Sequence, residues 1–290
     1  MPPRHVLLAL AVVAIWGSNF VVIKVALAQL PPLLFATLRF TLAVLPAVFF
    51  LPRPAVPWRS LAAYGLLVGV GQFGLLYLAM RSQISPGLAS LVIQTQVFFT
   101  LLLAMRVAQE KVRGYQWLAL GLAALGIGTI AIHTDGSTTV LGLAMVLTAA
   151  FSWACGNIVG KSAGRVNMLA YMVWTSLFAA PPLLALSLVV EGPVQMLAGL
   201  QRADAAAWAA VLWQALGNTL FGYGVWGWLL ARHPAATIVP MALLVPVFGI
   251  GSAALLLGEP LPAWKLVAAA LVLSGLALNL LWPLWKTRSA

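Results

Sequence analysis

The chain has 290 residues, of which 63% are hydrophobic and only 7% are charged, and its mean hydropathy is +1.03. A soluble protein carries about a quarter charged residues, so these few charges cannot cover a water-exposed surface. The net charge of +11 comes from basic residues scattered singly at the ends of apolar runs, which argues against a nucleic-acid partner. Cys155 is the sole cysteine, which excludes an intrachain disulfide and a CxxC metal or redox site.

Apolar runs of about 20 residues recur along the chain, long enough for helices to cross a hydrocarbon core of ~30 Å. The runs are continuously apolar, whereas strands of an outer-membrane barrel alternate apolar and polar residues. We therefore predict an all-α integral membrane protein with ten transmembrane helices. The predicted spans are residues 5–27, 32–51, 60–80, 86–106, 113–132, 139–161, 168–190, 205–230, 234–257 and 263–283.

The first span also resembles a signal peptide, because Ala26-Leu27-Ala28 is similar to a cleavage site. Its apolar region is longer than the usual 7–15 residues of a signal peptide and ends in Lys24, so we expect it to be a transmembrane helix. With the N-terminus inside, eleven Lys and Arg residues fall at cytoplasmic ends and four at outer ends. The excess of basic residues in cytoplasmic loops predicts that both termini are cytoplasmic.

A nine-residue motif of the first span recurs in the sixth span. "WGSNFVVIK", residues 16–24, is echoed 137 residues later by "WACGNIVGK", residues 153–161. A second correspondence, at an offset of 149, joins Glu110 to Glu259 and Gly126 to Gly275, and the larger offset indicates longer loops in the second half, notably 191–204. We predict two five-helix repeats, residues 1–136 and 137–290, within one integrated membrane domain; chance similarity of apolar sequences is the alternative.

Five helices are an odd number, so the second repeat enters the membrane from the opposite side to the first. Such inverted-topology repeats are the architecture of many secondary transporters, with the substrate site between the repeats. The ten spans, the tryptophan-rich first helix, "LRF" with Arg39, and the junctions "RVAQEKV" and "LLLGEPLPAW" resemble the EamA-type drug/metabolite transporters. The resemblance covers essentially the whole chain and is closest to the YddG-type amino-acid exporters.

This resemblance implies a secondary transporter that exports amino acids, neutral or aromatic, and related small organic solutes. It implies alternating access in a bacterial inner membrane, with small-molecule substrates and lipid as the partners. A drug or other metabolite exporter of the same superfamily is the first alternative. A membrane-embedded enzyme and a receptor or structural protein are alternatives from other classes.

Uncharged polar side chains recur inside the spans, where they are costly against lipid and are candidates for a functional site. They occur in matching helices of the two halves and alternate with aromatic residues, which also include Phe73, Trp174 and Trp226. Hydrogen bonding between helices is the alternative explanation. We predict a substrate cavity lined by Trp16, Asn19, Gln72, Tyr77, Gln94, Gln96, Trp153, Asn157, Trp213, Asn218 and Tyr223.

Glycine and proline residues in the third, eighth and ninth spans predict moving parts. Glycine also permits close helix packing, which is the alternative, and proline frees backbone groups that must find other partners in lipid. The predicted flexible positions are Gly71, Gly74, Gly222, Gly224, Pro240 and Pro246.

Charged residues are rare inside the spans. All five acids, Glu110, Asp135, Glu191, Asp204 and Glu259, fall at loops or helix ends, so we expect transport without a buried proton-coupling carboxylate. Arg39 lies within a span and is expected either to snorkel outward or to pair with a helix C-terminus or a substrate carboxylate. Glu110 and Glu259 are expected to cap the following helices or to form loop ion pairs, and Lys24 and Lys161 to mark interfaces.

Several chemistries have no motif in the sequence. GxxxxGK[ST], HExxH and GxSxG are absent, which argues against ATP drive, zinc protease and esterase chemistry. The three histidines, His5, His133 and His233, lie near span ends. We therefore expect a transporter rather than an enzyme, with no metal and no cofactor; the substrate range, coupling ion and oligomeric state stay open.

Overall fold

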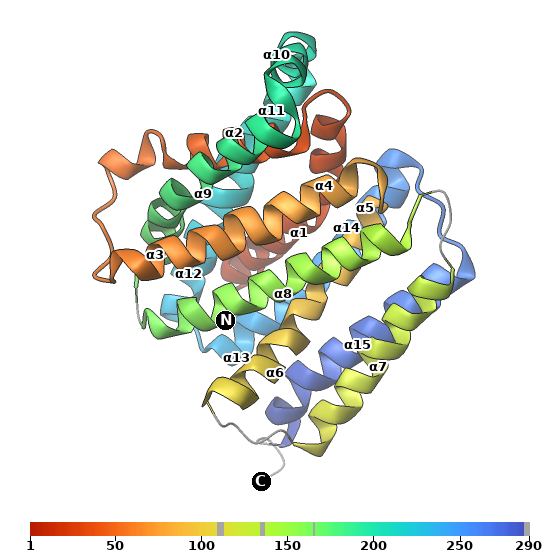
Figure 1. Ribbon diagram of the computed structural model, residues 1–290. Helices are drawn as coiled ribbons and strands as arrows, with labels where there is room; N and C mark the ends of the chain where they lie inside the picture. Colours follow the sequence, from red (N-terminus) through yellow and green to blue (C-terminus); the bar gives the residue numbers. More distant parts are fainter. Residues whose placement is uncertain (109–112, 134–136, 165, 287–290) are drawn as a thin grey trace.

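The computed structural model describes residues 1–108, 113–133, 137–164 and 166–286, and every regular element in these ranges is helical (Figure 1). Two of the elements, η2 and η4, are π-helices, and η1, η3 and η5 are 3-10 helices. In chain order the elements are α1 (Pro3–Leu27), α2 (Pro32–Val44), η1 (Ala47–Phe49), α3 (Trp58–Tyr64), η2 (Gly65–Gly74), α4 (Leu75–Ser82), α5 (Pro86–Val92), η3 (Ile93–Thr95), α6 (Gln96–Ala108), α7 (Gly114–Ile132), α8 (Val140–Ser162), α9 (Met168–Val190), α10 (Gly192–Arg202), α11 (Ala205–Leu212), η4 (Trp213–Phe221), α12 (Gly222–Arg232), α13 (Ala235–Ile238), η5 (Val239–Leu243), α14 (Leu244–Leu257) and α15 (Ala263–Lys286).

Nine helical stretches within the described ranges are long and apolar enough to cross a membrane. The tenth predicted span is the continuous helix α11–η4–α12, which is long enough but contains Gln214 and Asn218 and is not among the nine. The prediction of an all-α integral membrane protein built from ten helical spans is confirmed.

Two local expectations need correction. The second span was expected to reach residue 51 and runs to Phe49, but its α-helix ends at Val44 and Leu45 is extended. The cause is Pro46, which has no backbone N–H and disfavours the helical conformation of the residue before it. Residues 191–204 were expected to form a loop, but most of them form α10, an amphipathic helix with Pro193 in its first turn.

Irregular helix occurs at matching places in the two halves. The π-helices lie in the third and eighth spans, and the 3-10 segments η3 and η5 in the fourth and ninth. η2 begins at Gly65 and η4 at Trp213, 148 residues apart, which falls between the offsets of 137 and 149 in the sequence. The backbone therefore repeats in the same order as the sequence does, and this supports a chain built from two five-helix repeats.

The helices divide into a packed bundle and a peripheral pair. α7 and α15 run side by side along one edge (Figure 1), where Gly126 and Gly275 allow the two backbones to approach closely.

Large apolar side chains lie on the outer surface of the bundle; Leu255 of α14, for example, is 87% exposed. In water such a surface would aggregate, whereas against lipid tails it is solvated.

α1 crosses α14 at Gly17, deep inside the bundle. A Cβ atom on Gly17 would lie 2.5 Å from the carbonyl oxygen of Val245 and would also collide with the Cβ of Phe248. The obstacle includes backbone, so it cannot be relieved by rotating a side chain. Gly17 therefore fixes how closely the first helix of one half approaches the ninth span of the other.

We predict that Gly17→Ala lowers the free energy of unfolding by roughly 1–3 kcal/mol, the usual cost of forcing a methyl group into a packed interior. The measurement is thermal unfolding of the purified protein in detergent. Gly251→Ala is the matched control, because the added Cβ at this α14 position meets nothing within 4 Å. Equal melting temperatures for Gly17→Ala and wild type would contradict the predicted close contact.

Candidate functional site

A cavity of about 470 Å³ lies between the two halves of the chain. Its wall is formed by α1, α3, η2, α4, η3, α6, α8, α9, η4, α12, η5, α14 and α15, so each repeat supplies a part of it. Most of its wall is apolar, and the polar groups are amides and hydroxyls. Nine of the predicted cavity residues lie on its wall: Trp16, Asn19, Gln72, Gln94, Gln96, Trp153, Asn157, Asn218 and Tyr223.

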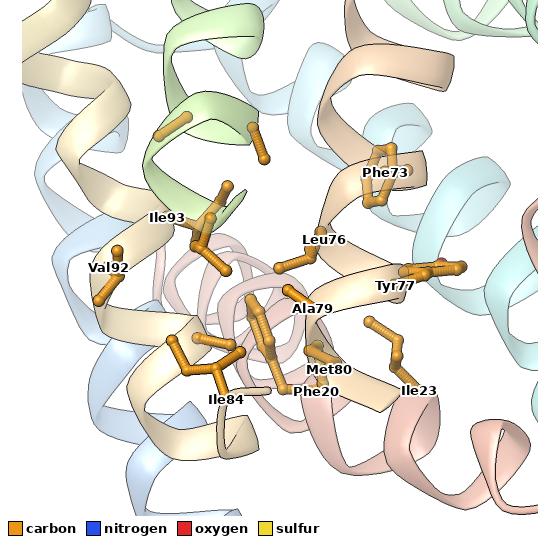
Figure 2. Close-up of a cluster of buried hydrophobic side chains, with 14 of the residues drawn as sticks. Phe20, Ile23, Phe73, Leu76, Tyr77, Ala79, Met80, Ile84, Val92 and Ile93 are labelled. Atoms are coloured by element: carbon orange, nitrogen blue, oxygen red, sulfur yellow. The ribbon is translucent and has the colours of Figure 1, made fainter. Parts of the chain in front are cut away.

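One end of the cavity is sealed by packed apolar side chains. Phe20, Ile23 and Leu76 form the floor of the cavity. Beyond them, Met80 and Ile84 are almost completely buried, and Figure 2 shows these side chains converging from α1, from α4 and from the turn that follows α4. No more than 2% of Leu76 or of the residues behind it is exposed, so the apolar layer closes the path at this end.

Hydrogen bonds hold the helix ends together behind this apolar layer. The carboxylate of Glu259 accepts a hydrogen bond from the hydroxyl of Ser85 and another, at 2.9 Å, from the backbone N–H of Gly87. It also forms an ion pair with Lys265 at 3.1 Å. Lys24 donates to the carbonyl oxygens of Met80 and Arg81 at the end of α4. A carboxylate of the second half thus caps α5 of the first half.

The expectations for these charged residues are met only in part. Glu259 forms a loop ion pair, as one expectation had it, but it caps α5 rather than the following helix α15. A carboxylate at a helix N-terminus is stabilised by the free N–H groups and the helix dipole, wherever along the chain that helix lies. Glu110 lies outside the described residues.

The opposite end of the cavity reaches toward the side of the bundle that holds the chain termini. Met168 at the start of α9, Val239 at the start of η5 and Leu280 near the end of α15 belong to its wall there. α1 begins on this side at Pro3. The cavity is therefore closed at the end away from the termini and extends toward the other.

Two hydrogen-bonded clusters shape the polar part of the wall. Asn157 donates to Gln96 Oε1 at 2.7 Å and to Thr100 Oγ1 at 3.2 Å, which ties α8 to α6. Trp16 Nε1 donates to the carbonyl oxygen of Asn218 at 3.1 Å, and its ring packs against Tyr223 and Trp226. Tyr64, Thr100, Met168 and Leu280 also line the cavity and were not predicted, because tyrosine, threonine and apolar residues near span ends are common at membrane interfaces.

Two amide side chains of the cavity wall each have an oxygen atom without a hydrogen-bond partner in the described part of the chain. Asn19 Oδ1 and Gln72 Oε1 are buried, and neither has a hydrogen-bond partner in the described part of the protein. An unpaired buried amide group costs about 1–3 kcal/mol. Because both residues line the cavity, a rotation of either side chain would turn its amide toward a polar solute, and both stay candidates for substrate contacts.

Two predicted cavity residues are not on the wall. Tyr77 is fully buried behind it, where its hydroxyl accepts a hydrogen bond from Arg39, and Trp213 is 39% exposed on the outer surface. The prediction assigned the polar and aromatic side chains of these spans to the interior without separating the faces of a helix. Trp213 begins the π-helix η4, and Tyr77 lies in α4 just after the π-helix η2. A π-helix has one more residue per hydrogen-bonded turn than an α-helix, which changes the face on which the following side chains lie.

The predicted flexible positions lie at the irregular segments. Gly71 and Gly74 are in η2, Gly222 and Gly224 begin α12, Pro240 is in η5, and Pro246 is in the first turn of α14. A Cβ on Gly71 would collide with Ser152 of α8, and one on Gly222 would lie 2.5 Å from Trp16 Nε1. Both glycines therefore permit close contacts, and their part in motion stays a prediction.

A membrane bundle with a central cavity, shared by two repeats and lined by aromatic and amide side chains, has the design of a solute transporter rather than an enzyme. The chain belongs to the EamA-like transporter family, whose model matches it twice, at residues 3–132 and 140–281. The resemblance inferred from the sequence is thereby confirmed.

Relatives named for amino-acid efflux cover nearly the whole chain. A Salmonella typhimurium protein named probable amino-acid metabolite efflux pump is 42% identical over 94% of this chain and 93% of its own. An Escherichia coli K12 protein with the same name is 40% identical over 99% and 98%. A solved crystal structure aligns with a TM-score of 0.67 over 97% of both chains at 16% identity, which supports the fold alone.

We predict that a cysteine at position 96, introduced into a Cys155→Ser background, reacts with a water-soluble thiol reagent, because Gln96 lines the cavity. A cysteine at position 213 should react at least about tenfold more slowly, since a thiolate does not form against lipid. Labelling in membrane vesicles measures both rates. Equal rates would show that the cavity wall is assigned wrongly.

Proposed function

We propose that the protein is a secondary transporter that exports amino acids and related small organic solutes across a bacterial inner membrane. The observation that carries this proposal is the central cavity, which is lined by aromatic rings and neutral amides from both repeats. Its volume of about 470 Å³ is in the range of small-molecule sites. The names of the relatives support amino acids as the solutes.

Alternating access is the proposed mechanism. The cavity is sealed at the end away from the termini, and the excess of Lys and Arg on the terminus side supports a cytoplasmic location for that side. On this orientation the structure is an inward-facing state, ready to accept a solute from the cytoplasm. Release outside then requires the Glu259 cap and the layer around Met80 and Ile84 to separate.

We further propose that transport needs no titrating carboxylate in the membrane core. The three acids that the structure describes all have other partners: Glu191 accepts the N–H groups of Leu33 and Leu34, Asp204 accepts that of Ala207, and Glu259 caps α5. None of the three lies on the cavity wall. This arrangement supports facilitated movement down the solute's own gradient.

A drug or other metabolite exporter remains the second candidate. The observation that favours it is the apolar part of the wall, formed by Phe20, Leu243, Val245 and Leu276, which would accept many amphiphilic organic molecules. The two candidates differ in whether the solute must carry the polar groups of an amino acid.

Counterflow in proteoliposomes tests the proposal. Vesicles loaded with unlabelled phenylalanine are diluted, without any ion gradient, into labelled phenylalanine. The proposal predicts transient accumulation of label that protein-free vesicles lack. Absence of exchange with phenylalanine and with every other amino acid would reject amino acids as the solutes and would favour drugs or other metabolites.

We predict that Asn157→Ala lowers this exchange by about fivefold or more, since the loss of one buried polar contact is worth roughly 1–3 kcal/mol and each 1.4 kcal/mol is a factor of ten. Trp153→Ala should also lower it, because it removes an aromatic ring from the cavity wall. Leu255→Ala is the matched control, because Leu255 points into lipid. All three variants are expected to insert in similar amounts. An exchange rate that falls only in proportion to the amount of inserted protein would reject the site assignment.

A further inference from the structure

Arg39 is a buried cation beside the cavity. It is 1% exposed, so the expectation that it snorkels to the membrane surface is wrong. Its guanidinium donates to Tyr77 Oη at 2.8 Å and to Thr219 Oγ1 at 3.3 Å, and it stacks on the ring of Phe73, 3.8 Å from the centroid. Its Nε group is buried and has no partner among the described residues.

The partners of Arg39 carry no negative charge. The hydroxyl groups of Tyr77 and Thr219 and the ring of Phe73 compensate the charge of the guanidinium only partly. An uncompensated charge inside a membrane costs at least a few kcal/mol. Glu191, Asp204 and Glu259, the acids that the structure describes, are bonded to other groups. An anion carried by the solute would therefore compensate the buried charge of Arg39.

The position of Arg39 makes this arrangement effective. Phe73 touches the guanidinium and also lines the cavity, so one ring separates the charge from the solute space. Gln72 and Asn218 are the chain neighbours of Phe73 and Thr219, and both line the cavity. Figure 2 shows Phe73 and Tyr77 one turn apart on the same helix, facing away from the apolar layer around Met80 and Ile84.

We propose that Arg39 is the specificity-determining charge of this transporter, and that it selects solutes whose carboxylate lies beside Phe73, within reach of the amides of Gln72 and Asn218. The proposal rests on the proposed function, since it names the part of an amino acid that the cavity recognises. The guanidinium lies 3.8 Å from the centroid of Phe73, so a carboxylate on the opposite face of this ring would lie about twice as far from the charge. At an effective dielectric constant near 20, the attraction over about 8 Å favours the carboxylate by about tenfold or more.

Binding of phenylalanine and phenylalaninamide to the purified protein tests this charge selection. The two ligands differ only in the carboxylate, and the emission of the cavity tryptophans reports binding. Wild type is expected to prefer phenylalanine by at least about tenfold. Arg39→Gln should reduce the preference to less than about twofold while phenylalaninamide still binds, and Arg39→Lys should retain most of it.

A purely structural role for Arg39 gives a different result. If Arg39→Gln weakens the binding of phenylalanine and of phenylalaninamide equally, the ratio of their affinities is unchanged. The inference is then overturned and the proposed function stands. If wild type binds neither phenylalanine nor any other amino acid, the proposed function fails and this inference fails with it. Leu255→Ala is the control that should leave both affinities unchanged.

A second variant covers the case in which Arg39→Gln does not fold. Phe73→Leu keeps the charge and removes the ring between the guanidinium and the cavity, so the preference for phenylalanine over phenylalaninamide should rise by about threefold or more. An unchanged or smaller preference would overturn the inference.

Discussion

Hydrocarbon offers no hydrogen bonds, so every polar group inside this protein must find a partner within the protein or in its solute. The rest of the structure depends on this constraint. Most of the bundle meets it with regular helices and apolar side chains. The cavity departs from it in two ways. Its wall includes the π-helical segments η2 and η4 and the 3-10 segments η3 and η5, and the amide oxygens of Asn19 and Gln72 have no partner among the residues that the structure describes. These departures meet at one place, between the two repeats.

The same constraint explains the contrast between the two ends of the cavity. At the sealed end, Glu259 satisfies the start of α5, Lys24 satisfies the end of α4, and apolar side chains fill the space behind the cavity floor. Toward the termini the cavity extends to Met168, Val239 and Leu280. A closed end held by a few exchangeable bonds is what alternating access requires, because those bonds can break without unfolding any helix.

Much of the fold follows from the sequence, because a length of about 20 apolar residues and the echo of Trp16–Lys24 at Trp153–Lys161 are properties of composition and spacing. Nine of the eleven cavity residues were found because polar side chains avoid lipid and because aromatic residues, Trp16 and Trp153 among them, alternate with the polar ones and recur in the repeat. Tyr77 and Trp213 were misplaced because residue type alone does not give the helix face, and no sequence rule located the π-helices η2 and η4 beside them. Arg39 was ambiguous, because only the packing of Tyr77, Thr219 and Phe73 around it decides between burial and snorkelling.

Solute is proposed to cross only when the sealed end opens, and a chemical link across that end would prevent the opening. Cysteines at Ser85 and Glu259, which touch across the seal, are joined by a short bifunctional thiol reagent in a Cys155→Ser background. The account predicts that amino-acid exchange in proteoliposomes stops on cross-linking and returns when the link is cleaved. Exchange that continues at the unlinked rate after complete cross-linking would contradict it.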